Sequence, residues 1–339
     1  MFRLALTAAL FLLAATSLPA QNQTRYFELT PPPAKVRGSL YRYLEFLDSR
    51  EDTALIGVIQ TGLLKNRDAN LVFKTPILPQ FQELMSGIVD SGAQDGTVLF
   101  QLRDLSFVEP TDSRYLHLCA TLYVRTDGGY RKLSTIDTTR IFDVTDILNQ
   151  IKRVVNWQLD NFISAALTNP AADSVLYSPA DLAHIDSIEM HRLPVYTSAS
   201  FTDGLYLSFS SFSKQLPDRQ AMVTAKKDGS ISAVQVLDEQ AKKVKLKPKD
   251  VYAIVYQGRP FIATEYGYYR LERAGDNFFF TGDIRIKASQ RDINGGQMAL
   301  GLLGAYAASR GNQETYDLRV DHLNGSFIHL HLIPKPQTP

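Results

Sequence analysis

The chain has 339 residues, of which 45% are hydrophobic and 21% are charged, as in an ordinary folded globular protein. Its 36 basic and 35 acidic side chains give a formal net charge of +1, which excludes a global electrostatic surface for nucleic acid or an anionic membrane. Cys119 is the single cysteine, so an internal disulfide is excluded, and its apolar surroundings in YLHLCATLYV indicate a buried, unreactive thiol.

The first twenty residues have the layout of a secretory signal peptide. Arg3 supplies the positive start, residues 4–17 form an apolar stretch, and Ala20 is a small residue before the expected cleavage site. A retained membrane anchor would need ~20 predominantly apolar residues, whereas this stretch is shorter and is interrupted by Pro19. We therefore expect an exported protein, periplasmic or extracellular, that is cleaved near Ala20 and has no transmembrane helix in its mature chain.

The residues that follow predict a sheet with one helix. A polar, proline-rich segment, residues 21–40, is expected to be an extended lead-in. The apolar, branched run at 54–64 predicts a buried strand, although a buried helix fits the same pattern. Apolar residues at three- and four-residue spacing predict a helix over 77–89. The segments 98–109 and 115–133 predict strands.

The clearest helix lies over residues 144–167, where apolar residues form one continuous stripe. Asp143 is a candidate N-cap, and the Asn-Pro pair at 169–170 is a stop signal. With a hairpin turn at 127–129, these elements predict an α+β domain over residues 41–169, in which two helices cover one face of a small sheet.

The remaining chain predicts a linker and a second domain. Residues 170–200 are expected to be a linker with a short helix that begins at 178–179. Residues 201–335 predict an antiparallel β-rich meander or barrel-like domain, whose last hairpin turns at a type I′ signal, 324–325. The apolar run at 298–309 predicts one short helix packed on the sheet, with a membrane-touching or oligomerising segment as the alternative. The predicted strands are 221–237, 244–256, 260–272, 277–287, 315–323 and 327–333.

Residues 193–271 carry a resemblance to known proteins. It rests on the segments LPVYTSAS (193–200), FTDGLYLSFSSFSKQLP (201–217) and KLKPKDVYAIVYQGRPFIATEYGYYRL (245–271). With these segments the chain resembles uncharacterised exported proteins of Gram-negative bacteria, a family of unknown function, so the resemblance implies no activity. More loosely, the outline of residues 41–169 resembles small envelope-associated α+β modules of transport and assembly machines, and an outline does not imply a function.

His329 and His331, in SFIHLHLIP, are the best metal candidate in the sequence. Residues two apart on a strand point to one face, so both imidazoles could reach one ion, and His322 and Asp321 on the partner strand could complete the set. The alternative is a half-exposed strand with its apolar residues inward and its histidines outward. We favour this alternative, because zinc sites need three or four ligands and no spacing specifies the third.

Two further surfaces are candidate binding sites. Lysines recur on one face of a presumed strand and could hold an anionic polymer, although edge-strand lysines also deter aggregation without any partner. Tyrosines gather in a later strand pair and could stack on sugars or peptides, although such residues more often pair across a sheet as core. The residues concerned are Lys243, Lys245, Lys247 and Lys249, and Tyr266, Tyr268 and Tyr269.

No motif commits the chain to catalysis. The sequence contains no G-x-S-x-G, H-E-x-x-H, G-x-G-x-x-G or G-x-x-x-x-G-K-[ST] pattern, and no cofactor is predicted. A carboxylate pair brought together by folding has no fixed spacing and stays open. We expect a non-catalytic exported protein of the cell envelope that binds a partner protein or supports an assembly. The alternatives are an envelope hydrolase with a site between the domains, and a metal- or anionic-polymer-binding module.

Overall fold

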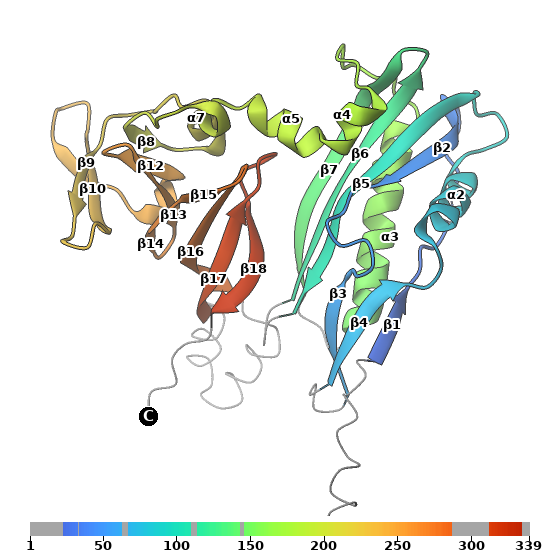
Figure 1. The fold of residues 1–339 in the computed structure, drawn as a ribbon, viewed down its shortest axis with the longest axis horizontal. Helices are drawn as coiled ribbons and strands as arrows, with labels where there is room; N and C mark the ends of the chain where they lie inside the picture. The colour runs from blue at the N-terminus through green and yellow to red at the C-terminus, as the bar shows by residue number, and fades with distance from the viewer. Residues whose placement is uncertain are drawn as a thin grey trace, which may run out of the picture.

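The computed structural model describes residues 23–32, 34–62, 67–109, 114–142, 146–286 and 312–333. These residues form a mixed α and β structure with open sheets, in which an N-terminal region and a C-terminal region are bridged by short helices (Figure 1). The expected signal peptide at 1–20 and the apolar run at 298–309 lie outside the described residues.

Seven strands of the N-terminal region form one mixed sheet, in the order β1-β4-β3-β5-β6-β7 with β2 paired to β5. β2 and β3 both run parallel to β5, whereas β5, β6 and β7 are successive antiparallel neighbours. The close pairing of β3 with β5 requires Gly57, because a Cβ atom at this position would lie 2.0 Å from the Phe107 carbonyl oxygen. The strands are β1 (Gln23–Phe27), β2 (Tyr41–Asp48), β3 (Gly57–Thr61), β4 (Arg67–Phe73), β5 (Gly96–Val108), β6 (Arg114–Thr126) and β7 (Gly129–Phe142).

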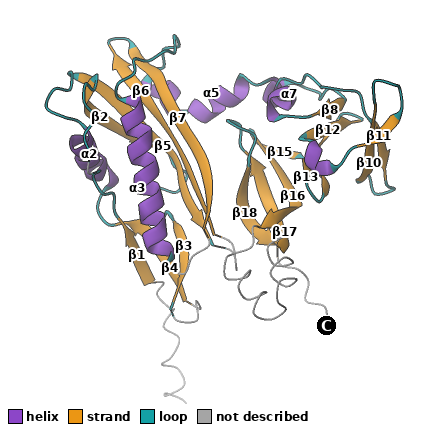
Figure 2. Cartoon of the chain, turned by 180° about the vertical axis from the view of Figure 1, so that it is seen from behind, coloured by secondary structure: helices purple, strands orange, loops and turns teal. Residues whose placement is uncertain are grey.

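Two amphipathic helices, α2 (Ile77–Ile88) and α3 (Ile147–Ala166), cover one face of this sheet (Figure 2). Their buried stripes join the alternate inward residues of the strands in one apolar core. Both predicted helices are confirmed within three residues at each end. The α3 N-cap is Asp146, whose side chain accepts a hydrogen bond from the Asn149 backbone N–H, and Asp143 lies outside the described residues.

Strand β1 departs from the prediction of an extended lead-in. It pairs in parallel with β4, and Phe27 at its end is fully buried in the core. The sequence QTRYF does not indicate a core strand, because its first four residues stay exposed. Their backbone hydrogen bonds come only from the tertiary pairing with β4.

The second face of the sheet is covered, near the top in Figure 1, by the short helices that follow α3. Leu182 and Ile185 pack with Tyr123 and Tyr177 on this face, and Gln101 Nε2 donates to the Leu182 carbonyl oxygen at 2.8 Å. The helix predicted from Ser178 is present as two pieces, followed by a third. They are α4 (Pro179–Ala183), α5 (Ile185–His191) and α6 (Pro194–Thr197).

The described residues of the C-terminal region form three small sheets, in the orders β11-β10-β9, β14-β13-β12-β8 and β15-β16-β17-β18. They pack around two apolar cores. Its elements are β8 (Gly204–Tyr206), α7 (Phe209–Ser213), β9 (Met222–Ala225), β10 (Ile231–Leu237), β11 (Lys243–Lys245), the 3₁₀ turn η1 (Pro248–Asp250), β12 (Ala253–Tyr256), β13 (Arg259–Thr264), β14 (Gly267–Arg270), β15 (Glu272–Ala274), β16 (Asn277–Ile286), β17 (Asn312–Val320) and β18 (Phe327–Ile333).

The antiparallel pairing predicted for this region is confirmed, but the described strands do not close into a barrel. The span predicted as one strand over 244–256 is interrupted by η1, whose proline cannot donate to a strand ladder. β11 and β12 therefore belong to different sheets.

Candidate functional site

A cleft of about 840 Å³ lies between the seven-stranded sheet and the β15–β18 sheet. Both regions supply its walls, with Arg103, Ser106 and His117 on one side and Phe279, Asp321 and Ile328 on the other. Clefts between structural units that combine apolar walls with a few polar groups are frequent ligand sites. The cleft is therefore our candidate functional site.

A β-bulge in β5 places two charged side chains beside this cleft. Leu102 is the Cα partner of Ala120 and Asp104 that of Cys119, so Arg103 is an extra residue in the strand. Without the bulge, Asp104 would follow the alternation of Phe100 and Leu102 into the apolar core. With the bulge, Arg103 and Asp104 both line the cleft.

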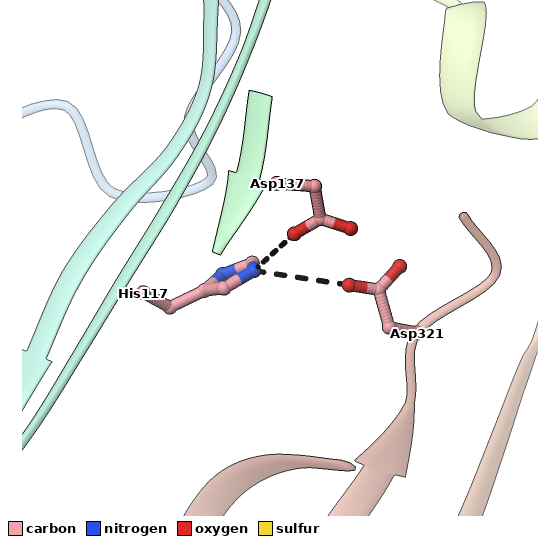
Figure 3. Close-up of side chains that lie close together, drawn as sticks. All are labelled: His117, Asp137 and Asp321. Carbon is pink, nitrogen blue, oxygen red and sulfur yellow. Dashed lines mark hydrogen bonds and ion pairs between the residues drawn. The ribbon is translucent and has the colours of Figure 1, made fainter. Parts of the chain in front are cut away.

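His117 on β6 is the centre of the first polar cluster. Its Nδ1 lies 3.0 Å from Asp104 Oδ2, and its Nε2 lies 2.9 Å from Asp137 Oδ1 and 3.8 Å from Asp321 Oδ2. Figure 3 shows the carboxylates of Asp137 and Asp321 converging on one edge of the imidazole. The cluster joins β5, β6 and β7 to the loop that follows β17.

The pKa values in this cluster follow from burial and mutual contact. Burial lowers the pKa of His117, but hydrogen bonds to Asp104 and Asp137 outweigh it and raise the pKa to about 9. Burial would raise the pKa of Asp137, yet its contact with His117 holds that pKa below the usual range. Burial and the neighbouring Asp137 raise the pKa of Asp321 to about 6. His117 is therefore cationic at neutral pH.

The β17–β18 loop (residues 321–326) positions the C-terminal partners of this cluster. The Asp321 backbone N–H donates to the Ser326 carbonyl oxygen at 2.9 Å, and the Leu323 N–H donates to Asp321 Oδ1 at 2.9 Å. Asn324 Nδ2 donates to Asp137 Oδ2 at 2.7 Å. The loop is thus wider than the two-residue turn predicted from Asn324-Gly325, and it contacts the N-terminal sheet.

Arg103 is the centre of the second polar cluster, which includes helix α5. Its side chain is 2% exposed, and its Nη2 donates to Asp186 Oδ1 and to Glu189 Oε2, the latter at 2.6 Å. Lys132 also donates to Glu189, and His322 Nε2 lies 3.5 Å from the same carboxylate. Burial would raise the pKa of Glu189, but these neighbours hold it far below its usual range. The buried charges are therefore paired.

Cys119 lies on β6 between the two clusters. It is 5% exposed and lines the cleft, and it is the Cα partner of Asp104 on β5 and of Asp137 on β7. Burial raises the pKa of the Cys119 thiol well above its usual value. The prediction of a buried thiol is confirmed.

The three histidines predicted as metal ligands occupy different surroundings. His329 stacks on Tyr115 of β6, with ring centroids 3.9 Å apart, and makes an edge contact with Tyr316. Among the described residues, neither ring nitrogen of His329 has a hydrogen-bond partner, and burial lowers the pKa of His329 to about 4. His331 is exposed, and His322 faces Arg103 and Glu189. Within the described ranges, the groups with metal-like spacing are His117/Asp137/Asp321 and Asp186/Glu189/His322.

The predicted lysine and tyrosine surfaces lie away from the cleft lining. Lys243 and Lys245 are on the edge strand β11, and all four predicted lysines are exposed. Tyr268 packs into the core around β10, whereas Tyr269 packs into the core around β16. Tyr266 is half-buried. Whether these surfaces bind a ligand remains a prediction.

Sequence reasoning missed most of the residues at the centre of the site. Arg103, Asp104, His117, Asp137 and Asp321 come from four segments and match no motif. The sequence indicated only Asp321, as a possible ligand beside His322 for an ion at His329 and His331. The sequence of β6 contained one indication of the site. His117 and Cys119 occupy alternate positions in a largely apolar strand, which indicates that both faces of this strand are buried. Their partners become visible only in the fold.

No protein-family model and no curated protein matches the chain. Three solved chains match, among them protein XCC0632 from Xanthomonas campestris, assigned to family DUF330. The two proteins are 12% identical and superpose with a TM-score of 0.27, over 43% of this chain and 96% of that one. This likeness to an uncharacterised bacterial family is weak, and we base no argument on it.

Among the described residues, no helix is both long enough and apolar enough to cross a membrane.

Proposed function

We propose that this protein is a non-catalytic, exported binding module of the cell envelope, which holds its ligand in the cleft between its two regions. The observation that carries the proposal is the cleft itself, about 840 Å³ in volume and walled by both regions. Pockets of this size, lined by apolar surface with a few polar groups, suit a small molecule or an inserted partner segment.

The chemistry of the cleft favours binding over catalysis. Both ring nitrogens of His117 already contact carboxylates, at 3.0 Å and 2.9 Å. The imidazole is held cationic at neutral pH, with its pKa raised to about 9 by those contacts after burial has lowered it. A cationic imidazole has no free lone pair, so it is a poor general base. The apolar stretch at 1–20 supports an exported location.

The proposal is tested by native mass spectrometry of the full chain recovered from a periplasmic fraction. A bound ligand should appear as a mass adduct on the wild-type protein. Ser106→Trp fills the cleft and should remove the adduct, whereas Lys243→Trp on the remote edge strand should keep it. A protein absent from the periplasmic fraction, or an adduct unaffected by Ser106→Trp, contradicts the proposal.

One observation favours a second candidate, an envelope hydrolase with its site between the regions. Burial and Asp137 raise the pKa of Asp321 to about 6, so this carboxyl group holds a proton at mildly acidic pH, and it lines the cleft. Such a group suits a general acid. Turnover of an ester, peptide or glycoside panel that is lost in Asp321→Asn would favour the hydrolase.

A further inference from the structure

Three ligand atoms from the two regions meet beside the cleft. His117 Nε2, Asp137 Oδ1 and Asp321 Oδ2 belong to a group whose members all lie within 4.8 Å of one another. Two ligands that each lie about 2.1 Å from one ion at the tetrahedral angle are about 3.4 Å apart. The distances from Nε2 to the two oxygens, 2.9 Å and 3.8 Å, lie on either side of that separation.

The surrounding contacts orient these atoms toward one another. Asp104 Oδ2 lies 3.0 Å from His117 Nδ1, which fixes the ring and directs Nε2 to the other two carboxylates. Asn324 Nδ2 donates a hydrogen bond to Asp137 Oδ2 at 2.7 Å, which leaves Asp137 Oδ1 directed at His117. A carboxylate behind the histidine and a hydrogen bond behind the ligating carboxylate are the usual supports of a protein metal site.

The charge of the group calls for a cation. Three carboxylates surround one imidazole, and the side chains of Asp137 and Asp321 are 8% and 5% exposed. Even a cationic His117 leaves an excess of negative charge with little access to water. The nearby guanidinium of Arg103 is already paired with Asp186 and Glu189. A divalent ion would balance the remaining charge.

Cys119 lies next to two of the three ligand residues, His117 and Asp137, in the sheet. The residue is 5% exposed and lines the same cleft. The register places it directly between Asp104 and Asp137, two residues from His117 on the same face of β6. The thiol is not among the groups whose ligand atoms all lie within 4.8 Å of one another, so Cys119 belongs to the surroundings of the three ligands and is not assigned as a fourth.

We propose that His117, Asp137 and Asp321 bind one divalent cation of the zinc type, with Asp104 as the residue that orients His117. The ion takes the place of the proton that His117 Nε2 shares with Asp137. Because Asp321 belongs to the C-terminal region, the ion links the two regions. This inference does not depend on the identity of any ligand in the cleft.

The test is calorimetric titration of zinc alone into the chelator-treated full chain. Wild-type protein should bind one ion per chain, and Asp137→Asn and Asp321→Asn should abolish that binding. Asp104→Asn should weaken it about 10- to 100-fold, the usual effect of losing an orienting partner. His331→Gln, which removes an exposed histidine on the neighbouring strand, should leave it unchanged.

Circular dichroism and the thermal midpoint establish that each variant is folded. Asp321→Asn is the decisive variant, because its residue lies in a loop and the substitution keeps its shape. Absence of zinc binding by the wild type overturns the proposal. Undiminished binding by folded Asp321→Asn, or loss of binding in His331→Gln, overturns it as well.

Discussion

The two faces of β5 and β6 are made from alternate residues of the same strands, but they are buried by different means. The face under α2 and α3 is apolar, with Phe100, Leu102 and Leu122 all at most 1% exposed. The opposite face carries Arg103 and His117, each 6% exposed. That face is covered by helix α5 and by the C-terminal region, and not by α2 and α3.

This difference separates two kinds of burial. An apolar face gains free energy from removal from water wherever it is covered, and its partners need only the right shape and volume. A polar face can be covered only if each group finds a partner, because an unpaired buried donor or charge costs several kcal/mol. The contact between the two regions therefore depends on specific pairs such as Arg103–Glu189 and His117–Asp137.

The largest effect is expected on the apolar face. Phe100 is fully buried, and its ring centroid lies 4.5 Å from that of Phe81. Phe100→Ala leaves a cavity among these rings and should lower the free energy of unfolding by about 3–5 kcal/mol, measured by urea denaturation. Ser106→Ala, on the cleft face of the same strand, is the control and should change stability by about 0.5 kcal/mol or less. Equal losses in the two variants would contradict the comparison.

The next effect is a pH dependence at the contact between the regions. Burial lowers the pKa of His329 to about 4, so below pH ~6.5 the unfolded chain binds a proton that the folded chain excludes. The contribution of neutral His329 to the free energy of unfolding is fully present above pH ~6.5 and is lost as the pH falls toward 4. The free energy of unfolding should fall by about 3 kcal/mol over this range.

His329→Phe keeps a flat ring between Tyr115 and Tyr316 and removes this titration. Urea unfolding at several pH values should show the wild type losing stability relative to His329→Phe as the solution is acidified. A stability difference that stays constant between pH 7 and pH 4 would refute the assignment.

A smaller effect is expected in the Arg103 cluster. Glu189→Gln keeps the side-chain volume but removes the charge that pairs with Arg103 and Lys132. The free energy of unfolding should fall by about 2 kcal/mol, because charge-assisted hydrogen bonds are replaced by weaker ones. Glu239→Gln, at an exposed position in the C-terminal region, should change stability by about 0.5 kcal/mol or less. Equal free energies of unfolding for Glu189→Gln and Glu239→Gln would show that the Arg103 cluster does not stabilise the contact between the two regions.

Much of the local structure could be predicted from the sequence. The helices over 77–88 and 147–166 and the hairpin turn at 127–128 follow from apolar periodicity and turn residues, which act within a few positions of the chain. Two elements could not be predicted. β1 is polar along most of its length, and the bulge at Arg103 requires the pairing partner to be known. Both depend on hydrogen bonds to strands distant in sequence.

The sequence by itself determined the balanced charge, the apolar first stretch, the buried single cysteine and the antiparallel character of the second half. Only the tertiary structure decided the site. Asp104 and His117 come together through a bulge, and Asp321 reaches them across more than 200 positions through the β17–β18 loop. Periodicity records which side of an element faces an apolar core, because burial acts on each residue separately. The meeting of three particular polar side chains depends on register and on how two regions pack, and local sequence does not encode either.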